Sequence, residues 1–210
     1  LSGNLTGTFE NNRASYDYVE YSGGGAIYIM NGVSGNLIGT FINNSAKDGC
    51  VDSGGGAIYI NLGGVSGNLI GTFEKNRVDF VGGDTFWVGS GGGAIHINLG
   101  NISGNLIGTF INNTADDGGG AIYMGSGDIS GNLIGTFINN TARYGGAVYM
   151  HSGTVSNCNF INNTATNGDG GAIRMSSGSV ENCNFTNNKA EYGGAVYFLV
   201  NGSLDRKSVV

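Results

Sequence analysis

Apolar and polar residues alternate along the chain in short runs, a pattern of β-strands rather than of helices. The run Gly-Ala-Ile-Tyr-Ile at 56–60 alternates small or apolar residues with larger ones, and Cys158-Asn159-Phe160 alternates apolar with polar ones. These runs are rich in Ile, Val, Tyr, Phe and Thr, which strands favour. No stretch keeps a helical spacing over a useful length, so the sequence predicts an all-β fold.

The runs belong to a repeat that extends through almost the whole chain. The successive units are 32, 32, 37, 27, 26 and 25 residues apart. Repeats of this length are typical of solenoids, in which each unit buries its apolar face only against its neighbours. The segment Ser-Gly-Asn-Leu-Ile-Gly-Thr-Phe begins at Ser34, Ser66, Ser103 and Ser130, a variant begins at Ser2, and shortened forms begin at Ser156 and Glu181.

Two short signatures occur once in every unit, seven times each and in strict alternation. One is Gly-Gly-Ala followed by Ile or Val, and the other is Phe-x-x-Asn. Side-chain amides that stack at the strand spacing can hydrogen-bond along the stack, so we expect the asparagines to form a structural ladder at a turn. The expected ladder is Asn12, Asn44, Asn76, Asn113, Asn140, Asn163 and Asn188.

Stacking the units about 4.8 Å apart would pair each strand with its equivalents above and below. Phe with Ile or Val would then fill the interior, and seven coils would make a rod about 30 Å long. Leucine-rich repeats need leucines at set offsets and propeller blades need longer units, so both fit less well. We predict a parallel β-helix of about seven coils.

Residues 205–210, Asp-Arg-Lys-Ser-Val-Val, break the repeat and resemble a translated sequencing adapter. We therefore expect residues 1–204 to form a single β-helix domain, a fragment of a longer solenoid, followed by a non-native tail.

The units differ in length at one place, between the asparagine and the glycines. The distance from each Phe to the next Ala is 17, 16, 21, 11, 10, 12 and 10 residues, so the long insertions fall in coils 1 to 3. Loops that leave one corner of adjacent coils should lie side by side, and such loops often carry function.

Aromatic and acidic residues gather in these insertions. Rings beside carboxylates suit sugars, which offer both apolar CH faces and hydroxyls. One hypothesis is that they bind a glycan or a protein of a host or neighbouring cell; the other is that the rings fold back and cover the edge of the helix. The candidate ligand-binding residues are Tyr16, Tyr18, Tyr21, Asp84, Phe86 and Trp87.

Composition and charge narrow the choice of partner. The chain has 210 residues with 42 Gly and no Pro, a formal net charge of −6 and a pI of about 4.6. The acidic balance argues against nucleic acid and against an anionic membrane surface. No apolar run approaches the length of about 20 residues that spans a bilayer.

Other reactive residues suggest neither a metal site nor a cofactor. The loop aspartates have no spacing of a known calcium loop, so solvated carboxylates are the simpler interpretation. Cys158 and Cys183 occupy equivalent positions and should stack inside, with a disulfide left open; His96 replaces the usual Tyr after Gly-Ala-Ile. The frequent Asn-x-Ser/Thr sequons are interpreted as part of the turn ladder, with glycosylation as the alternative.

The paired motifs carry a family resemblance over nearly the whole chain. Repeated Gly-Gly-Ala-Ile with Phe-x-x-Asn resembles the chlamydial polymorphic outer membrane proteins, and Phe-Ile-Asn-Asn-Thr-Ala at 110–115 and 137–142 is similar to adhesin-like surface proteins of methanogenic archaea. The resemblance implies a right-handed parallel β-helix at the cell surface, associated with the cell wall or outer membrane and used in attachment. It implies no cofactor and no catalytic residues.

A polysaccharide lyase or glycoside hydrolase is the alternative function, because many enzymes of this class use a parallel β-helix. Fold alone does not decide between the two. Most of the basic residues fall singly on different coils, and the regularity of the repeat argues against an active site.

Overall fold

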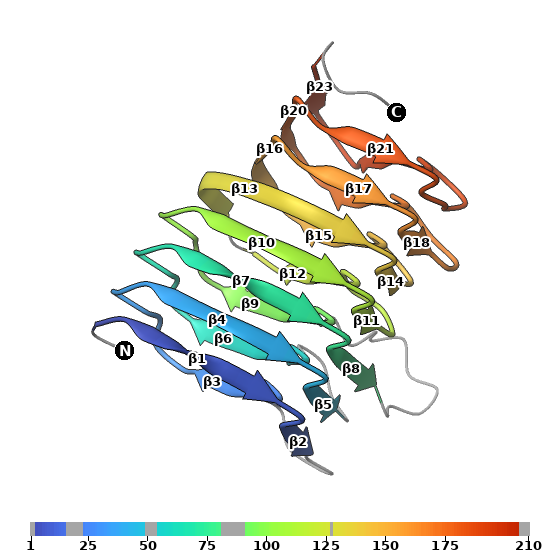
Figure 1. Ribbon diagram of the computed structural model, residues 1–210. Helices are drawn as coiled ribbons and strands as arrows, with labels where there is room; N and C mark the ends of the chain where they lie inside the picture. Colours follow the sequence, from blue (N-terminus) through green and yellow to red (C-terminus); the bar gives the residue numbers. More distant parts are fainter. Residues whose placement is uncertain (1–2, 16–22, 49–53, 81–90, 127, 206–210) are drawn as a thin grey trace.

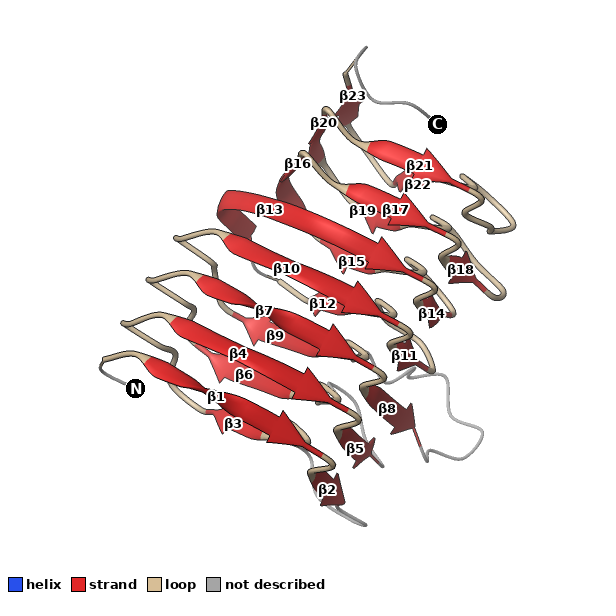
Figure 2. Cartoon of the chain, in the orientation of Figure 1, coloured by secondary structure: helices blue, strands red, loops and turns tan. Residues whose placement is uncertain are grey.

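The computed structural model describes residues 3–15, 23–48, 54–80, 91–126 and 128–205, and Figure 1 shows them as a stack of coils. Within these residues every regular element is a strand, and every strand pair is parallel (Figure 2). The strands form three sheets, each running along the axis of the stack. The predicted right-handed parallel β-helix is therefore confirmed.

Sheet A contains the Leu-Ile-Gly-Thr-Phe segments, and coils 6 and 7 divide this strand in two. Each segment lies directly over its equivalent; Phe41, for example, is paired with Phe9 on one side and Phe73 on the other. The strands are β1 (Leu5–Glu10), β4 (Leu37–Ile42), β7 (Leu69–Glu74), β10 (Leu106–Ile111), β13 (Asp128–Ile138), β16 (Ser152–Ser156), β17 (Asn159–Ile161), β20 (Gly178–Glu181), β21 (Asn184–Thr186) and β23 (Gly202–Leu204).

Sheet B is short and follows the asparagine turn. It covers a small apolar cluster of Ala46, Val78, Ala115 and Ala142. Its strands are β2 (Arg13–Ser15), β5 (Ser45–Asp48), β8 (Arg77–Phe80), β11 (Thr114–Ala115), β14 (Thr141–Ala142) and β18 (Thr164–Ala165).

Sheet C follows the Gly-Gly-Ala signature. Its Ile and Val residues point into the main core, and the residues between them point to the outer face. Its strands are β3 (Ile27–Ile29), β6 (Ile58–Leu62), β9 (Ile95–Leu99), β12 (Ile122–Met124), β15 (Val148–Met150), β19 (Ile173–Met175) and β22 (Val196–Phe198).

The main core is built from ladders of like residues. The seven phenylalanines of the Phe-x-x-Asn signature stack face to face; the ring centroids of Phe41 and Phe73 are 4.8 Å apart and their planes differ by 1°. A Cβ added at Gly71 would lie 3.0 Å from the Phe73 ring and 2.5 Å from the Gly39 carbonyl oxygen. In coils 1 to 5 the residue two positions before the phenylalanine is a glycine, which gives the ring the space in which it stacks, and in coils 6 and 7 this position is taken by Cys158 and Cys183.

The sheet A segment changes in the last two coils. Leu133 pairs with Val155 and Thr136 with Asn159, so coil 6 has one more residue than coil 5 between these positions. The extra residue is accommodated at Asn157, which has φ of 54°. Val155 is therefore the structural equivalent of Leu133. The shortened motif of coil 6, which begins at Ser156, starts one residue after it.

The chain continues in sheet A to the end of the described residues. The Asp205 backbone N donates to the Val180 carbonyl oxygen at 3.0 Å, and its Oδ1 accepts from the Asn182 backbone N at 3.1 Å. The rest of the expected tail, 206–210, lies outside the described residues.

Candidate functional site on the outer faces of the coils

The six candidate ligand-binding residues of the long insertions lie outside the described residues. They are Tyr16, Tyr18, Tyr21, Asp84, Phe86 and Trp87. Cys50 and Asp52 of the second insertion also lie outside them. The surfaces on which a site can be built are therefore the asparagine turn and the outer faces of the three sheets.

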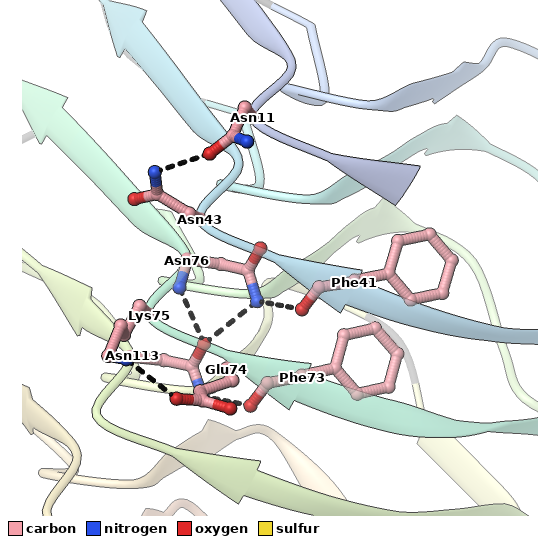
Figure 3. Close-up of polar contacts among 8 residues, drawn as sticks. All are labelled: Asn11, Phe41, Asn43, Phe73, Glu74, Lys75, Asn76 and Asn113. Atoms are coloured by element: carbon pink, nitrogen blue, oxygen red, sulfur yellow. Dashed lines mark hydrogen bonds and ion pairs between the residues drawn. The ribbon is translucent and has the colours of Figure 1, made fainter. Parts of the chain in front are cut away.

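The asparagine turn contains a buried amide ladder (Figure 3). Asn76 donates from both its backbone N and its side-chain Nδ2 to Oδ1 of Asn113, at 2.9 and 3.0 Å. Its Nδ2 also donates to the carbonyl oxygen of Phe41 at 3.0 Å. The same contacts join Asn12, Asn44, Asn76, Asn113, Asn140, Asn163 and Asn188. These amides are occupied in holding the coils together.

The asparagine just before each ladder residue has a different environment. Asn43, Asn112, Asn139 and Asn162 have φ between 51° and 56° and are exposed. Asn is among the few non-glycine residues that adopt this left-handed conformation readily. These exposed residues are the first asparagines of the Asn-x-Ser/Thr sequons. At these four turns the sequon asparagine is therefore a different residue from the buried ladder asparagine that follows it.

An aromatic column runs along the outer face of sheet C. Its members follow Gly-Gly-Ala by two residues and pair in register from coil to coil. Ring centroids are 5.4 Å apart for Tyr28 and Tyr59 and 5.0 Å apart for Tyr123 and Tyr149. The aromatic column consists of Tyr28, Tyr59, His96, Tyr123, Tyr149 and Tyr197, with Arg174 in the sixth coil.

The column is closed in coils 2 and 3. Tyr59 and His96 are fully buried, with centroids 4.8 Å apart. The Tyr59 hydroxyl donates to Oδ1 of Asn61 at 3.3 Å and accepts from Nδ2 of Asn98 at 3.4 Å. His96 therefore serves as a packed structural substitution for Tyr, as the sequence indicates.

The column is more open in coils 4 to 7. Tyr123, Tyr149 and Tyr197 are half-buried. In coil 4, Gly125 follows the strand where Asn98 stands in coil 3, and its N donates to the Ile97 carbonyl oxygen at 3.0 Å. The exposed His151 and half-buried Ser176 follow the next strands. Small or exposed residues thus stand beside these rings in place of the hydrogen-bonded asparagines.

Arg174 joins the column to a group of charged residues. Its guanidinium carbon lies 4.5 Å from the Tyr149 ring centroid and 5.0 Å from that of Tyr144, which is cation–π geometry. Its Nε lies 3.5 Å from Oδ2 of Asp169. On the neighbouring coils, NH1 of Arg143 lies 3.7 Å from Oδ1 of Asp117. We call Asp117, Arg143, Asp169 and Arg174 the ionic cluster.

The ionic cluster is incompletely hydrogen-bonded. Oδ1 of Asp117 and Nε of Arg174 are buried and form no hydrogen bond in the described part of the chain. The ion pairs at 3.5 and 3.7 Å are too long to replace hydrogen bonds. Burial raises the pKa of Asp117 to about 6, although Arg143 and Arg174 oppose the shift. Sequence analysis missed this cluster, because only the fold brings the single charges of coils 4 to 6 together.

The outer face of sheet A forms a shallow groove of about 590 Å³ across the first five coils. Its walls are columns of Ile and Thr, represented by Ile70 and Thr72, and its floor is the backbone of the glycine column, as at Gly71. No charged side chain lines this groove.

The cysteines and acids do not assemble a metal site in the described ranges. Cys158 and Cys183 are buried in adjacent coils as thiols, and the Cys158 backbone N donates to the Cys183 sulfur at 3.4 Å. Across 3–15, 23–48, 54–80, 91–126 and 128–205, no three His, Cys, Asp or Glu side chains come together as a metal-binding group.

Comparison with known families now identifies the repeat. A family model described as the Chlamydia polymorphic membrane protein (Chlamydia_PMP) repeat matches residues 6–30, 39–61, 108–125, 135–150, 157–175 and 182–199, more than half of the chain. This chain belongs to the polymorphic membrane protein repeat family. The resemblance to the chlamydial proteins is thereby confirmed.

The polymorphic membrane protein repeat is a surface-associated, adhesin-type repeat, and its family is not a known enzyme family. It implies a location at the cell surface or outer membrane. No curated protein and no solved structure matches the chain. Within the described ranges, the structure contains no helix with the length and apolarity needed to cross a bilayer.

Proposed function

We propose that this chain is an extracellular attachment module, displayed on the cell wall or outer membrane, that binds a glycan or protein of a host or neighbouring cell. Membership of an adhesin-type surface family supports this function. The stack also supports it, because the core is completed by interior ladders and leaves the outer faces available for contact.

The observation that carries the proposal is the aromatic column of sheet C. Tyr28 is 41% exposed, and three further tyrosines of the column are half-buried. Large rings at the outer face add little to the interior, which is already filled by the Phe, Ile and Val ladders. Tyr and Arg are enriched at recognition surfaces because they combine a flat apolar body with polar groups.

The long insertions of coils 1 to 3 form the second proposed contact surface. We expect Tyr16, Tyr18, Tyr21, Asp84, Phe86 and Trp87 to contribute there, since rings beside carboxylates suit sugars and polar protein surfaces. Replacing Trp87 by Ala should then weaken attachment. Attachment unchanged in Trp87→Ala would remove this surface from the proposal and leave the rest of it intact.

Attachment can be measured with beads that carry the full chain. Chain-coated beads should adhere to cultured animal cells or to neighbouring microbial cells more than albumin-coated beads do, and soluble chain should compete in a saturable way. Equal adhesion of both bead types on every cell surface tested would contradict the proposed function.

A further inference from the structure

We infer that the outer face of sheet C in coils 4 to 7 binds a neutral oligosaccharide along the axis of the rod. The surface, here the tyrosine–arginine strip, consists of Tyr123, Tyr149, Arg174 and Tyr197. The inference rests on the proposed function and names the ligand class and the site for it.

The strip is a row of flat groups that follow one another at the strand spacing. Tyr123 and Tyr149 have ring centroids 5.0 Å apart, and the Arg174 guanidinium lies 4.5 Å from the centroid of Tyr149. Tyr197 pairs in register with Arg174. An extended chain of sugar rings has its CH faces spaced along one direction, so a row of rings on a rigid sheet offers repeated contacts without loop ordering.

Accessibility separates this part of the column from coils 2 and 3. There, Tyr59 is fully buried and its hydroxyl is bound by Asn61 and Asn98. In coils 4 to 7 the column residues are half-buried, and Gly125 follows the coil 4 strand. The column is therefore partly accessible to a ligand in coils 4 to 7, whereas Tyr59 and His96 of coils 2 and 3 are fully buried.

The polar groups beside the strip favour a neutral ligand rich in hydroxyls. The ionic cluster contains two arginines and two aspartates, so its formal charges cancel. The side chain of Arg143 is 42% exposed and carries hydrogen-bond donors, and that of Asp169 is 19% exposed and carries acceptors. Sugar hydroxyls both donate and accept, which matches this mixture. The chain's net charge of −6 further disfavours acidic polysaccharides.

A protein partner fits the strip less well. The centres of protein interfaces are enriched in Tyr and Arg but depleted in Asp. Here Asp169 lies beside the middle of the strip, with its Oδ2 3.5 Å from Nε of Arg174. Tyr123 and Tyr149 meet edge to face, with their planes 74° apart, and Arg174 lies over the Tyr149 ring. This mixture of ring edges and charged groups is better suited to the CH groups and hydroxyls of sugars.

The test uses the full chain on an array of neutral oligosaccharides built from hexoses and N-acetylhexosamines, with sialylated and sulfated oligosaccharides as separate arms. Binding should be confined to neutral members, and Tyr123→Ala/Tyr149→Ala should lower the affinity for the best of them at least about tenfold. Tyr149→Phe, which keeps the ring, should retain most of the affinity.

The matched control is Thr40→Ala/Thr72→Ala on sheet A, a double substitution of outward residues on another face, and it should bind as the unaltered chain does. Melting curves of all variants establish that they are folded. Equal binding by the folded tyrosine double variant, or binding confined to acidic members, would overturn the inference.

Cell attachment separates this failure from failure of the proposed function. If beads adhere to cells but the array is silent, and adhesion survives enzymatic removal of cell-surface glycans, the partner is a protein: the inference fails and the attachment function stands. If neither cells nor oligosaccharides bind the unaltered chain, both fail.

Discussion

Asn76 makes two hydrogen bonds to a single atom, because its backbone N and its side-chain Nδ2 both donate to Oδ1 of Asn113 (Figure 3). Asn44 makes the same pair of bonds to Asn76. Each buried amide thus satisfies both a backbone donor and a Phe carbonyl oxygen of the preceding coil, as Asn76 does for the Asn44 N and the Phe41 oxygen. The ladder fixes the register between coils.

Replacing Asn76 by Ala should lower the free energy of unfolding by about 3 kcal/mol, since the Asn44 backbone N and the Phe41 carbonyl oxygen lose buried partners. Asn12→Ala is the matched control, because Asn12 holds the same position in an exposed coil and should cost less. Urea denaturation followed by circular dichroism measures both. Equal losses in the two variants would mean that burial of the ladder is unimportant.

The glycine two positions before the stacked phenylalanine in each of coils 1 to 5 leads to a second prediction. Gly71→Ala should destabilise the protein by about 1–3 kcal/mol, because the new Cβ meets the Gly39 carbonyl oxygen and the Phe73 ring. At Gly7 the nearest atom is in the Phe9 ring at 3.3 Å, and among the described residues no backbone atom beyond its chain neighbours lies within 4 Å, so Gly7→Ala should be tolerated better. Melting temperatures compare the two, and a larger loss at Gly7 would contradict the packing argument.

Asp117 should make stability depend on pH between about 4 and 6. Its pKa in the folded protein is about 6, above its ordinary value of 3.8, so the folded state binds more protons than the unfolded state in this window. Stability of the unaltered chain therefore falls as the pH rises through it. Asp117→Asn removes this titration, so the variant should not lose stability in this way. The difference in melting temperature, variant minus unaltered chain, should therefore increase from pH 4 to pH 7.

The control for this experiment is Asp116→Asn, which removes one negative charge from the same loop at an exposed position. A difference in melting temperature that stays constant with pH for Asp117→Asn would show that burial of the carboxyl does not govern its protonation.

The stacked cysteines should react slowly in the folded protein. Cys158 is 1% exposed and Cys183 is fully buried, and the hydrogen bond with Cys183 together with burial raises the pKa of Cys158. In a Cys50→Ser background, thiol labelling with a disulfide reagent should be more than about tenfold slower in buffer than in urea, because both sulfurs are buried away from the reagent and Cys158 is in addition held in the less reactive thiol form. Rapid native labelling, or a Cys158–Cys183 disulfide formed under mild oxidation, would contradict this packing.

The repeat predicts the scaffold well because each coil uses the same residues for the same contacts. The spacing of Phe73 from Asn76 is enough to indicate a core position and a turn position in coil 3, and six other copies agree. The register of coil 6 was harder to predict, since the residue inserted at Asn157 shifts the apparent start of the motif past Val155.

The candidate site was less predictable, for two physical reasons. The tyrosine two residues after Gly-Gly-Ala in five of the seven coils was a visible signal, but alternation alone does not reveal that Tyr59 is buried while Tyr123 is half-buried. Arg143 and Asp117 are far apart as single charges in the sequence, and only the stacking of coils brings them within 3.7 Å. Contacts across coils depend on loop lengths, which the repeat leaves variable.

The hydrogen bonds of the amide ladder connect residues 23 to 40 positions apart in the chain, as between Asn140 and Asn163 and between Asn113 and Phe73. Neighbouring coils are therefore held by contacts that do not pass through the segment joining them. A protease that cuts one insertion would separate the two pieces of backbone without separating the two coils. At a surface rich in proteases, such a rod could be nicked repeatedly and still hold its shape.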